Sequence, residues 1–178
     1  MERMIYMDFI ELAKKRYSTR NFNNKKVEQV KLEKILEAGR VAPTAANLQP
    51  QRILVIKTEA GLEKLKKAGN VYGAQLAFVV CADHSFSWKR AFDGKDTAEI
   101  DASIVATHMI LEATDLGLNS IWVGYFKPDV IKAEFALPEG VEPINILGIG
   151  YSDEERKSPD RHNTERKPLT ETVRYETF

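Results

Sequence analysis

Two arginines and a serine in one short segment are the first residues that could bind a ligand. Arg16, Ser18 and Arg20 alternate with Tyr17 and Thr19. In an extended chain, residues two apart point to the same side, so two guanidiniums and one hydroxyl would converge. Arginine forks bind phosphate through two hydrogen bonds, and a hydroxyl adds a third. The spacing favours an anion site, although a solvated basic loop would have the same composition.

A second polar segment, residues 42–50, lies between an apolar helical pattern and an apolar strand pattern. It holds Thr44, Asn47 and Gln49 and is bounded by prolines. Carboxamides donate and accept hydrogen bonds at once, which suits the edge of a pyrimidine-like ring. Ordinary capping of the loop explains the same residues.

The third segment ends in Trp122, Val123 and Gly124, on or just after a predicted strand. A glycine there lets a ligand approach the backbone and leaves an N–H that can point at a ring nitrogen. Core packing is the alternative for Trp122. Together the three segments suit a flat, phosphorylated cofactor.

Hydrophobic periodicity predicts the elements that position these segments. In the second helix, Val30, Ile35, Leu36 and Ala38 are expected to face the core. Helices that alternate with apolar strands indicate α/β or α+β layers around a covered sheet. The expected helices cover about 9–16, 28–42, 62–65, 97–116 and 128–135, and the expected strands 52–57, 76–82, 120–125 and 144–151.

Composition limits the class of protein. A chain of 178 residues with 43% apolar content suits a single domain over residues 1–178, and its zero net charge argues against nucleic acid or anionic lipid as partner. The single cysteine, Cys81, is expected to be an inert core thiol, and with three histidines no metal site is predicted. The apolar patch within residues 1–8 is too short for a signal peptide, and no run is long enough to span a membrane. We therefore expect a cytoplasmic protein.

Two segments lack a clear periodic pattern. Residues 83–97 mix polar residues with Phe86, Trp88 and Phe92, which predicts a lid. Residues 152–178 are charged, hold two prolines and show no helical stripe, so they cannot order themselves. This tail is expected either to be disordered or to lie on another surface.

The order and spacing of these motifs resemble the nitroreductase superfamily of FMN-dependent oxidoreductases, in its short form. The motifs that carry the resemblance are Arg16 to Arg20, Ala42 to Pro50, Asp115 to Leu118, Ser120 to Gly124 and Arg166 to Leu169. The resemblance implies a three-layer α+β fold, with a mixed, mainly antiparallel sheet flanked by helices. It also implies an intertwined homodimer with a swapped C-terminal arm and two FMN molecules at the subunit interface. The tail would then wrap the partner, and part of the helix over 97–116 would form the dimer core.

The family motif assigns the phosphate end of FMN to both ends of the chain. By that resemblance, Arg16 and Ser18 would hold the phosphate and ribityl chain, and Tyr17 would contribute through its backbone. Arg166, helped by Lys167, would complete the phosphate site.

The ring end of FMN is assigned in the same way. Arg20 would lie near the pyrimidine edge, and Gly124 would offer its backbone N–H near flavin N5. Trp122 and Val123 would lie close to the ring. The other subunit would contribute Pro43, Thr44, Ala45 and Asn47.

The resemblance implies an NAD(P)H-dependent enzyme that passes hydride or electrons through FMN to nitroaromatic, quinone or related electron-poor small molecules. Ping-pong kinetics are expected, with NADH or NADPH as donor and with no catalytic side chain. One alternative is a flavin-binding protein that carries FMN or fragments it. Another is enoate or reductive dehalogenase-type chemistry, for which the predicted lid offers charged residues, namely Arg90, Asp93, Lys95 and Asp96.

Overall fold

The computed structural model describes residues 8–178, so the expectation for the extreme N-terminus lies largely outside the described residues. The helices are α1 (Phe9–Lys15), α2 (Gln29–Val41), α3 (Glu59–Lys66), α4 (Ala98–Asp115), α5 (Pro128–Phe135), α6 (His162–Glu165) and α7 (Leu169–Thr172). Two short 3₁₀ turns are η1 (Ala45–Asn47) and η2 (Pro159–Arg161). The strands are β1 (Gln51–Ile56), β2 (Leu76–Asp83), β3 (Asn119–Val123) and β4 (Val141–Gly150).

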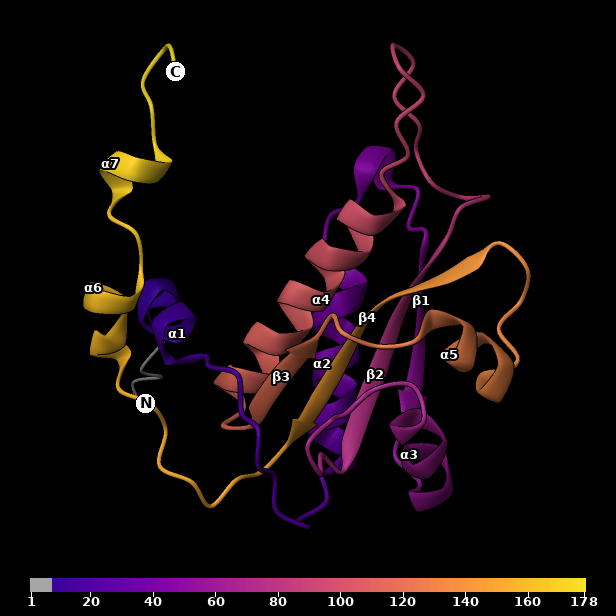
Figure 1. The fold of residues 1–178 in the computed structure, drawn as a ribbon, viewed down its shortest axis with the longest axis vertical. Helices are drawn as coiled ribbons and strands as arrows, with labels where there is room; N and C mark the ends of the chain where they lie inside the picture. The colour runs from indigo at the N-terminus through magenta and orange to yellow at the C-terminus, as the bar shows by residue number, and fades with distance from the viewer. Residues whose placement is uncertain (1–7) are drawn as a thin grey trace, which may run out of the picture.

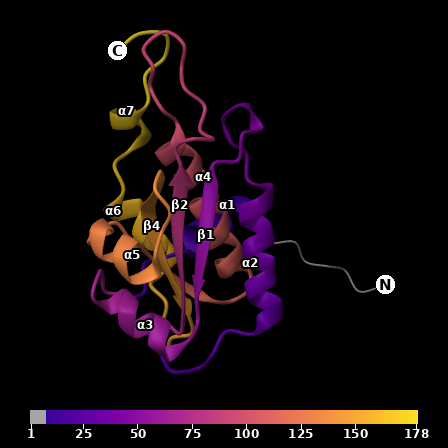
Figure 2. The ribbon, with the colours of Figure 1, turned by 90° about the vertical axis from the view of Figure 1, so that its right-hand side faces the viewer.

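The four strands form one sheet in the order β1-β2-β4-β3, and each neighbouring pair is antiparallel. Helices α2 and α4 cover one face, and α3 and α5 lie against the other (Figure 1 and Figure 2). A parallel bridge joins Ser18 to Ser120 of β3. The three-layer α+β prediction is confirmed. The swapped arm stays a prediction.

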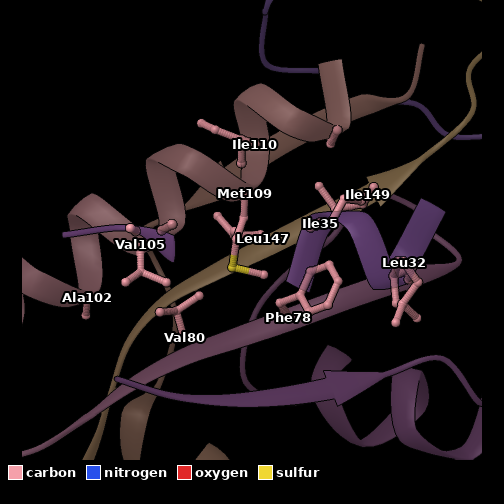
Figure 3. Packing of buried hydrophobic residues seen from close by; sticks show 14 of the residues in the cluster. Leu32, Ile35, Phe78, Val80, Ala102, Val105, Met109, Ile110, Leu147 and Ile149 are labelled. Atoms are coloured by element: carbon pink, nitrogen blue, oxygen red, sulfur yellow. The ribbon is translucent and has the colours of Figure 1, made fainter. Parts of the chain in front are cut away.

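The larger half of the core lies between the sheet and the helices α2 and α4. Met109 of α4 points toward Leu147 of β4, with Phe78 and Ile35 beside it (Figure 3). Gly39 lets the two helices approach closely, since a Cβ there would lie 3.0 Å from Cγ of Met109. This packing fixes α4 along the centre of the molecule.

The other half of the core lies under α3 and α5 and includes Cys81, which is 2% exposed. Burial raises the pKa of this thiol to about 12, so it stays protonated at neutral pH. The prediction of an inert core cysteine is confirmed.

Two predictions of burial are wrong. Val30 is 64% exposed, because Leu32 and Ile35 occupy the face of α2 that meets the core. The strand β1, expected to be buried, lies at the edge of the sheet, where only Ile56 is fully buried. Among the described residues, no helix combines the length and the apolar character needed to cross a membrane.

Residues 84–97, called here the hairpin segment, project beyond the sheet at the end where α4 begins (Figure 1). His84 lies at its base: Nδ1 is 3.0 Å from Oδ2 of Asp96, and Nε2 is 2.8 Å from Oε2 of Glu142. Near the tip, Arg90 forms two hydrogen bonds to Asp93. His84, Arg90, Asp93 and Asp96 of this segment are therefore each paired within the protomer.

Of the two alternatives for the tail, disorder is not what the structure shows, because residues 152–178 contain η2, α6 and α7. Its first part, through η2 and α6, lies against α1 of the same chain (Figure 1). From Arg166 onward it extends away from the sheet and carries α7. Four apolar side chains in this last part are exposed, namely Leu169, Val173, Tyr175 and Phe178.

Candidate functional site

The segment after α1 has the alternation that its sequence predicts. Tyr17 and Thr19 are buried, while Arg16, Ser18 and Arg20 line one surface cavity. The hydroxyl of Tyr17 accepts a hydrogen bond of 3.0 Å from Nδ2 of Asn119. The side chain of Tyr17 therefore points into the protein, and its backbone lies along the cavity.

Backbone contacts fix this segment against β3. Thr19 N donates to the carbonyl of Ser120 at 3.0 Å, and Ser18 pairs with Ser120 in the parallel bridge. The amide of Asn119 also donates to Oγ1 of Thr19. These bonds hold the chain extended, so the two-residue spacing of Arg16, Ser18 and Arg20 becomes a common direction.

The cavity has a volume of about 270 Å³ and is named here the basic cavity. Burial, and then the charges of Arg161 and Arg166, lower the pKa of Arg16 below its usual value. Three guanidiniums thus lie close enough to repel one another, which favours binding of an anion. Its lining residues are Arg16, Tyr17, Ser18, Arg20, Lys157, Arg161, His162, Glu165 and Arg166.

The tail supplies the part of the lining of the basic cavity that does not come from residues 16–20. Arg161 donates from Nη2 to the carbonyl of Arg16 at 2.7 Å, and His162 Nε2 lies 3.2 Å from the carbonyl of Lys14. Arg166 was predicted from the family motif, whereas Arg161 and His162 were not predicted. Arg161 and His162 lie five and four residues before Arg166, in a segment already expected to complete the site, and this closeness in sequence was the available signal.

Lys167, which the family motif adds to the phosphate site, does not line the basic cavity. Its Nζ lies 3.7 Å from a carboxylate oxygen of Glu171, and both side chains are largely exposed.

The end of β3 offers space beside the backbone. A Cβ added to Gly124 would meet no atom within 4 Å, so a flat group could lie directly against the main chain there. Val123 is buried, and Trp122 is half-buried against the core on the α4 side. Tyr125, which follows, is 98% exposed.

The polar turn after α2 has an unusual backbone. Ala46, Asn47 and Gln49 have φ angles of 50°, 55° and 53°, in the left-handed region that non-glycine residues seldom occupy. Oδ1 of the buried Asp101 accepts a hydrogen bond of 2.9 Å from Ala45 N, and Thr44 Oγ1 accepts one from Gln49 N. The turn is thus held in one strained shape.

Pro43, Thr44, Ala45 and Asn47 are on this turn, far from the basic cavity along the long axis of the protomer. The turn lies near the N-terminal end of α4, whereas α1 and α6 lie beside the other end (Figure 1 and Figure 2). One chain therefore does not bring the two halves of the predicted site together.

The family model described as "Nitroreductase family" matches residues 13–69 and 63–151, which together cover most of the chain. The chain belongs to the nitroreductase family. The match confirms the resemblance, and it includes the segments at Arg16, Ala42 and Gly124 but not Arg166.

Solved structures and curated proteins similar to this chain carry names of the same family. It is 55% identical, with a TM-score of 0.95, to a nitroreductase family protein from Clostridium difficile 630, covering 97% of this chain and 100% of that chain. It is 29% identical, with a TM-score of 0.77, to an FMN-dependent nitroreductase from Clostridium difficile R20291, covering 94% and 98%. A protein of Methanothermobacter thermautotrophicus, provisionally named NADH dehydrogenase/NAD(P)H nitroreductase, is 29% identical over 90% of this chain and 85% of its own length.

Proposed function

We propose that this chain is an FMN-dependent oxidoreductase that uses NADH or NADPH to reduce nitroaromatic, quinone or related electron-poor small molecules. The observation that carries the proposal is the basic cavity, in which Arg16 and Arg166 lie together although 150 positions separate them in the sequence. The names of the relatives support FMN and a nicotinamide donor.

The residues present fit FMN at both ends. The basic cavity offers the forked donors of Arg16 and Arg166 and the hydroxyl of Ser18, which match a terminal phosphate. The open backbone at Gly124 suits the flat ring. Both sets adjoin β3, because Ser18 pairs with its second residue and Gly124 follows its last.

The chain's own task is binding and orientation, whereas bound FMN would supply the hydride and electron chemistry. Arg16 and Arg166 would neutralise the phosphate, and Ser18 would donate a hydrogen bond to it. The open backbone at Gly124 would permit close approach of the ring, with the Gly124 N–H available as a donor. Tyr17 and Thr19, fixed by Asn119, keep this surface rigid. No side chain is assigned as an acid, base or nucleophile.

The site would be completed by a second copy of the chain. The turn with Pro43, Thr44, Ala45 and Asn47 is exposed or half-buried and is already held in one shape. Beside it, the outer face of α4 forms an apolar hollow of about 480 Å³ around Ile100 and Ile104. Two such faces could pair and bring each turn to the partner's β3.

Absorbance and anaerobic reduction test the cofactor. The purified protein should be yellow or take up FMN, bleach with NADH or NADPH in the absence of oxygen, and recolour when a nitroaromatic or quinone is added. A colourless protein that takes up no FMN contradicts the proposal.

A flavin carrier is the second candidate that the same cavity supports. Stopped-flow reduction separates the two, because a carrier would be reduced by NAD(P)H no faster than free FMN. The dehalogenase-type alternative loses support, since Arg90 pairs with Asp93 and Asp96 pairs with His84 rather than facing an open site.

Two truncations test the role of the tail. Removal of residues 168–178 leaves Arg166 in place but deletes the exposed apolar side chains, so dimerisation should weaken while the basic cavity persists. Removal of residues 152–178 should abolish both dimerisation and the basic cavity. Analytical ultracentrifugation measures dimerisation, and an unchanged dimer after the longer truncation contradicts the prediction that the tail wraps the partner.

A further inference from the structure

His162 joins α1 to the tail arginine of the basic cavity. Its Nε2 lies 3.2 Å from the backbone carbonyl of Lys14, at the C-terminal end of α1. Its Nδ1 lies 3.4 Å from Nε of Arg166, four residues along the chain. The ring is half-buried, while Arg166 is exposed. One imidazole therefore lies between a backbone carbonyl of α1 and the long, exposed side chain of Arg166.

These two contacts together define one form of the ring. A carbonyl can only accept, so Nε2 must carry a hydrogen. The guanidinium N–H can only donate, so Nδ1 must be unprotonated. Both bonds form only in the neutral tautomer with hydrogen on Nε2. An imidazolium would lose the bond to Arg166 and add another positive charge to the cavity that Arg16, Arg161 and Arg166 line.

We propose that His162 is a positioning residue that orients Arg166 into the basic cavity and so sets the affinity for the cofactor phosphate. This inference rests on the proposed FMN function and adds a residue to it. The charged groups that face the ring are those lining the cavity and the end of α1, namely Lys14, Arg16, Arg20, Lys157, Arg161, Glu165 and Arg166.

A rival explanation is that His162 only ties the tail to α1. Arg161 already makes such a tie, through its bond of 2.7 Å to the carbonyl of Arg16, the C-cap of α1. Its bond of 2.9 Å to the carbonyl of Ser158 lies within the tail. The bond that Arg161 does not duplicate is the one from Arg166 to Nδ1. The two explanations thus assign the importance of His162 to different ring nitrogens.

Two isosteric substitutions separate the ring nitrogens. In His162→Asn the side-chain oxygen replaces Nδ1 and can still accept from Arg166. In His162→Gln the amide replaces Nε2 and can still donate to Lys14. The proposal predicts that His162→Gln, like His162→Ala, weakens FMN binding about tenfold, while His162→Asn stays within about twofold of the unsubstituted protein. Quenching of flavin fluorescence gives the dissociation constants.

Riboflavin, which lacks the phosphate, is the matched ligand. Its affinity should be the same in all four proteins, since His162 acts through the phosphate end. The double variant His162→Gln with Arg166→Ala should bind FMN no more weakly than Arg166→Ala alone, because both remove one interaction.

The opposite pattern, in which Asn weakens FMN binding and Gln restores it, overturns the positioning role in favour of the tie to α1. Equal FMN affinity in all variants also overturns it. Failure of the unsubstituted protein to bind either flavin contradicts the proposed function itself, so the two failures are distinguishable.

Discussion

Two charged clusters of this protein differ in whether their charges are paired within the chain. In the His84 cluster, formed by His84, Asp96 and Glu142, each ring nitrogen faces a carboxylate. In the basic cavity, three guanidiniums lie together, and within residues 8–178 Arg16, Arg161 and Arg166 form no ion pair with a carboxylate. Charges that pair within the protein stabilise its fold, whereas like charges gathered at a cavity favour the binding of an anion from solution.

The pKa shifts express the same contrast. The hydrogen bond to Asp96, aided by that to Glu142, raises the pKa of His84 despite some burial. Burial opposes ionisation of Asp96, but hydrogen bonds from His84, Ala98 N and Ser87 lower its pKa to about 2. In the basic cavity burial, and then the charges of Arg161 and Arg166, lower the pKa of Arg16. The first cluster stabilises its own charges, and the second destabilises them.

The largest effect is expected from Arg16→Ala. Loss of a charged hydrogen bond to phosphate should cost about 2 to 3 kcal/mol, or about 30- to 150-fold in FMN affinity. Fluorescence titration measures it. Arg40→Ala is the matched control, since Arg40 is exposed and pairs only locally with Glu37. Unchanged flavin occupancy in Arg16→Ala refutes the phosphate assignment.

His84→Ala should act on stability and not on FMN binding. It removes two hydrogen bonds to carboxylates that are partly exposed, which we expect to lower the free energy of unfolding by about 1 kcal/mol. Urea unfolding of the apoprotein measures the change. A loss of FMN affinity comparable with that of Arg16→Ala would erase the distinction between the two clusters.

The contribution of His84 should also depend on pH, with a defined sign. A pKa raised in the folded state means that the charged ring stabilises the fold fully below the unfolded value of about 6.5, and that this is lost as pH rises through the folded value. The stability difference between the unsubstituted protein and His84→Ala should therefore be larger at about pH 6 than at about pH 9. In a Glu142→Gln background the pH-dependent part should shrink, and a difference that grows with pH contradicts the assignment.

The smallest effect is expected from Lys167→Ala. Because Lys167 lies outside the basic cavity and its pair with Glu171 is exposed, FMN affinity should change by less than about 0.5 kcal/mol. Arg166→Ala, one residue away, should weaken binding about tenfold. Equal losses in the two variants would show that the tail takes another path in the dimer.

Local patterns were the part of the structure that the sequence could predict. The alternation at Arg16, Ser18 and Arg20 depends only on an extended backbone, and the helix of α5 was predicted at its observed bounds, Pro128–Phe135. The burial of Cys81 followed from an unbroken apolar strand. In each case the signal and the structure span the same few residues.

Contacts between distant segments were not predictable in the same way. Arg161 and His162 reach α1 across 145 and 148 positions, and a polar segment has no periodicity that shows which surface it will meet. The exposure of Val30 and the edge position of β1 depend on which neighbours pack beside them. The family motif supplied Arg166, and it also supplied Lys167, which the structure places outside the cavity.

Helix α4 touches both halves of the predicted site. Near its start, Asp101 anchors the strained turn, and near its end Thr114 adjoins Arg16 and Tyr17. Its 18 residues span roughly 27 Å and are packed against the core along much of their length. In a dimer of the proposed kind, the turn serves one flavin and Arg16 the other, so each α4 would be a stiff spacer between two redox centres. The separation of the two flavins would then be set by the length of this helix.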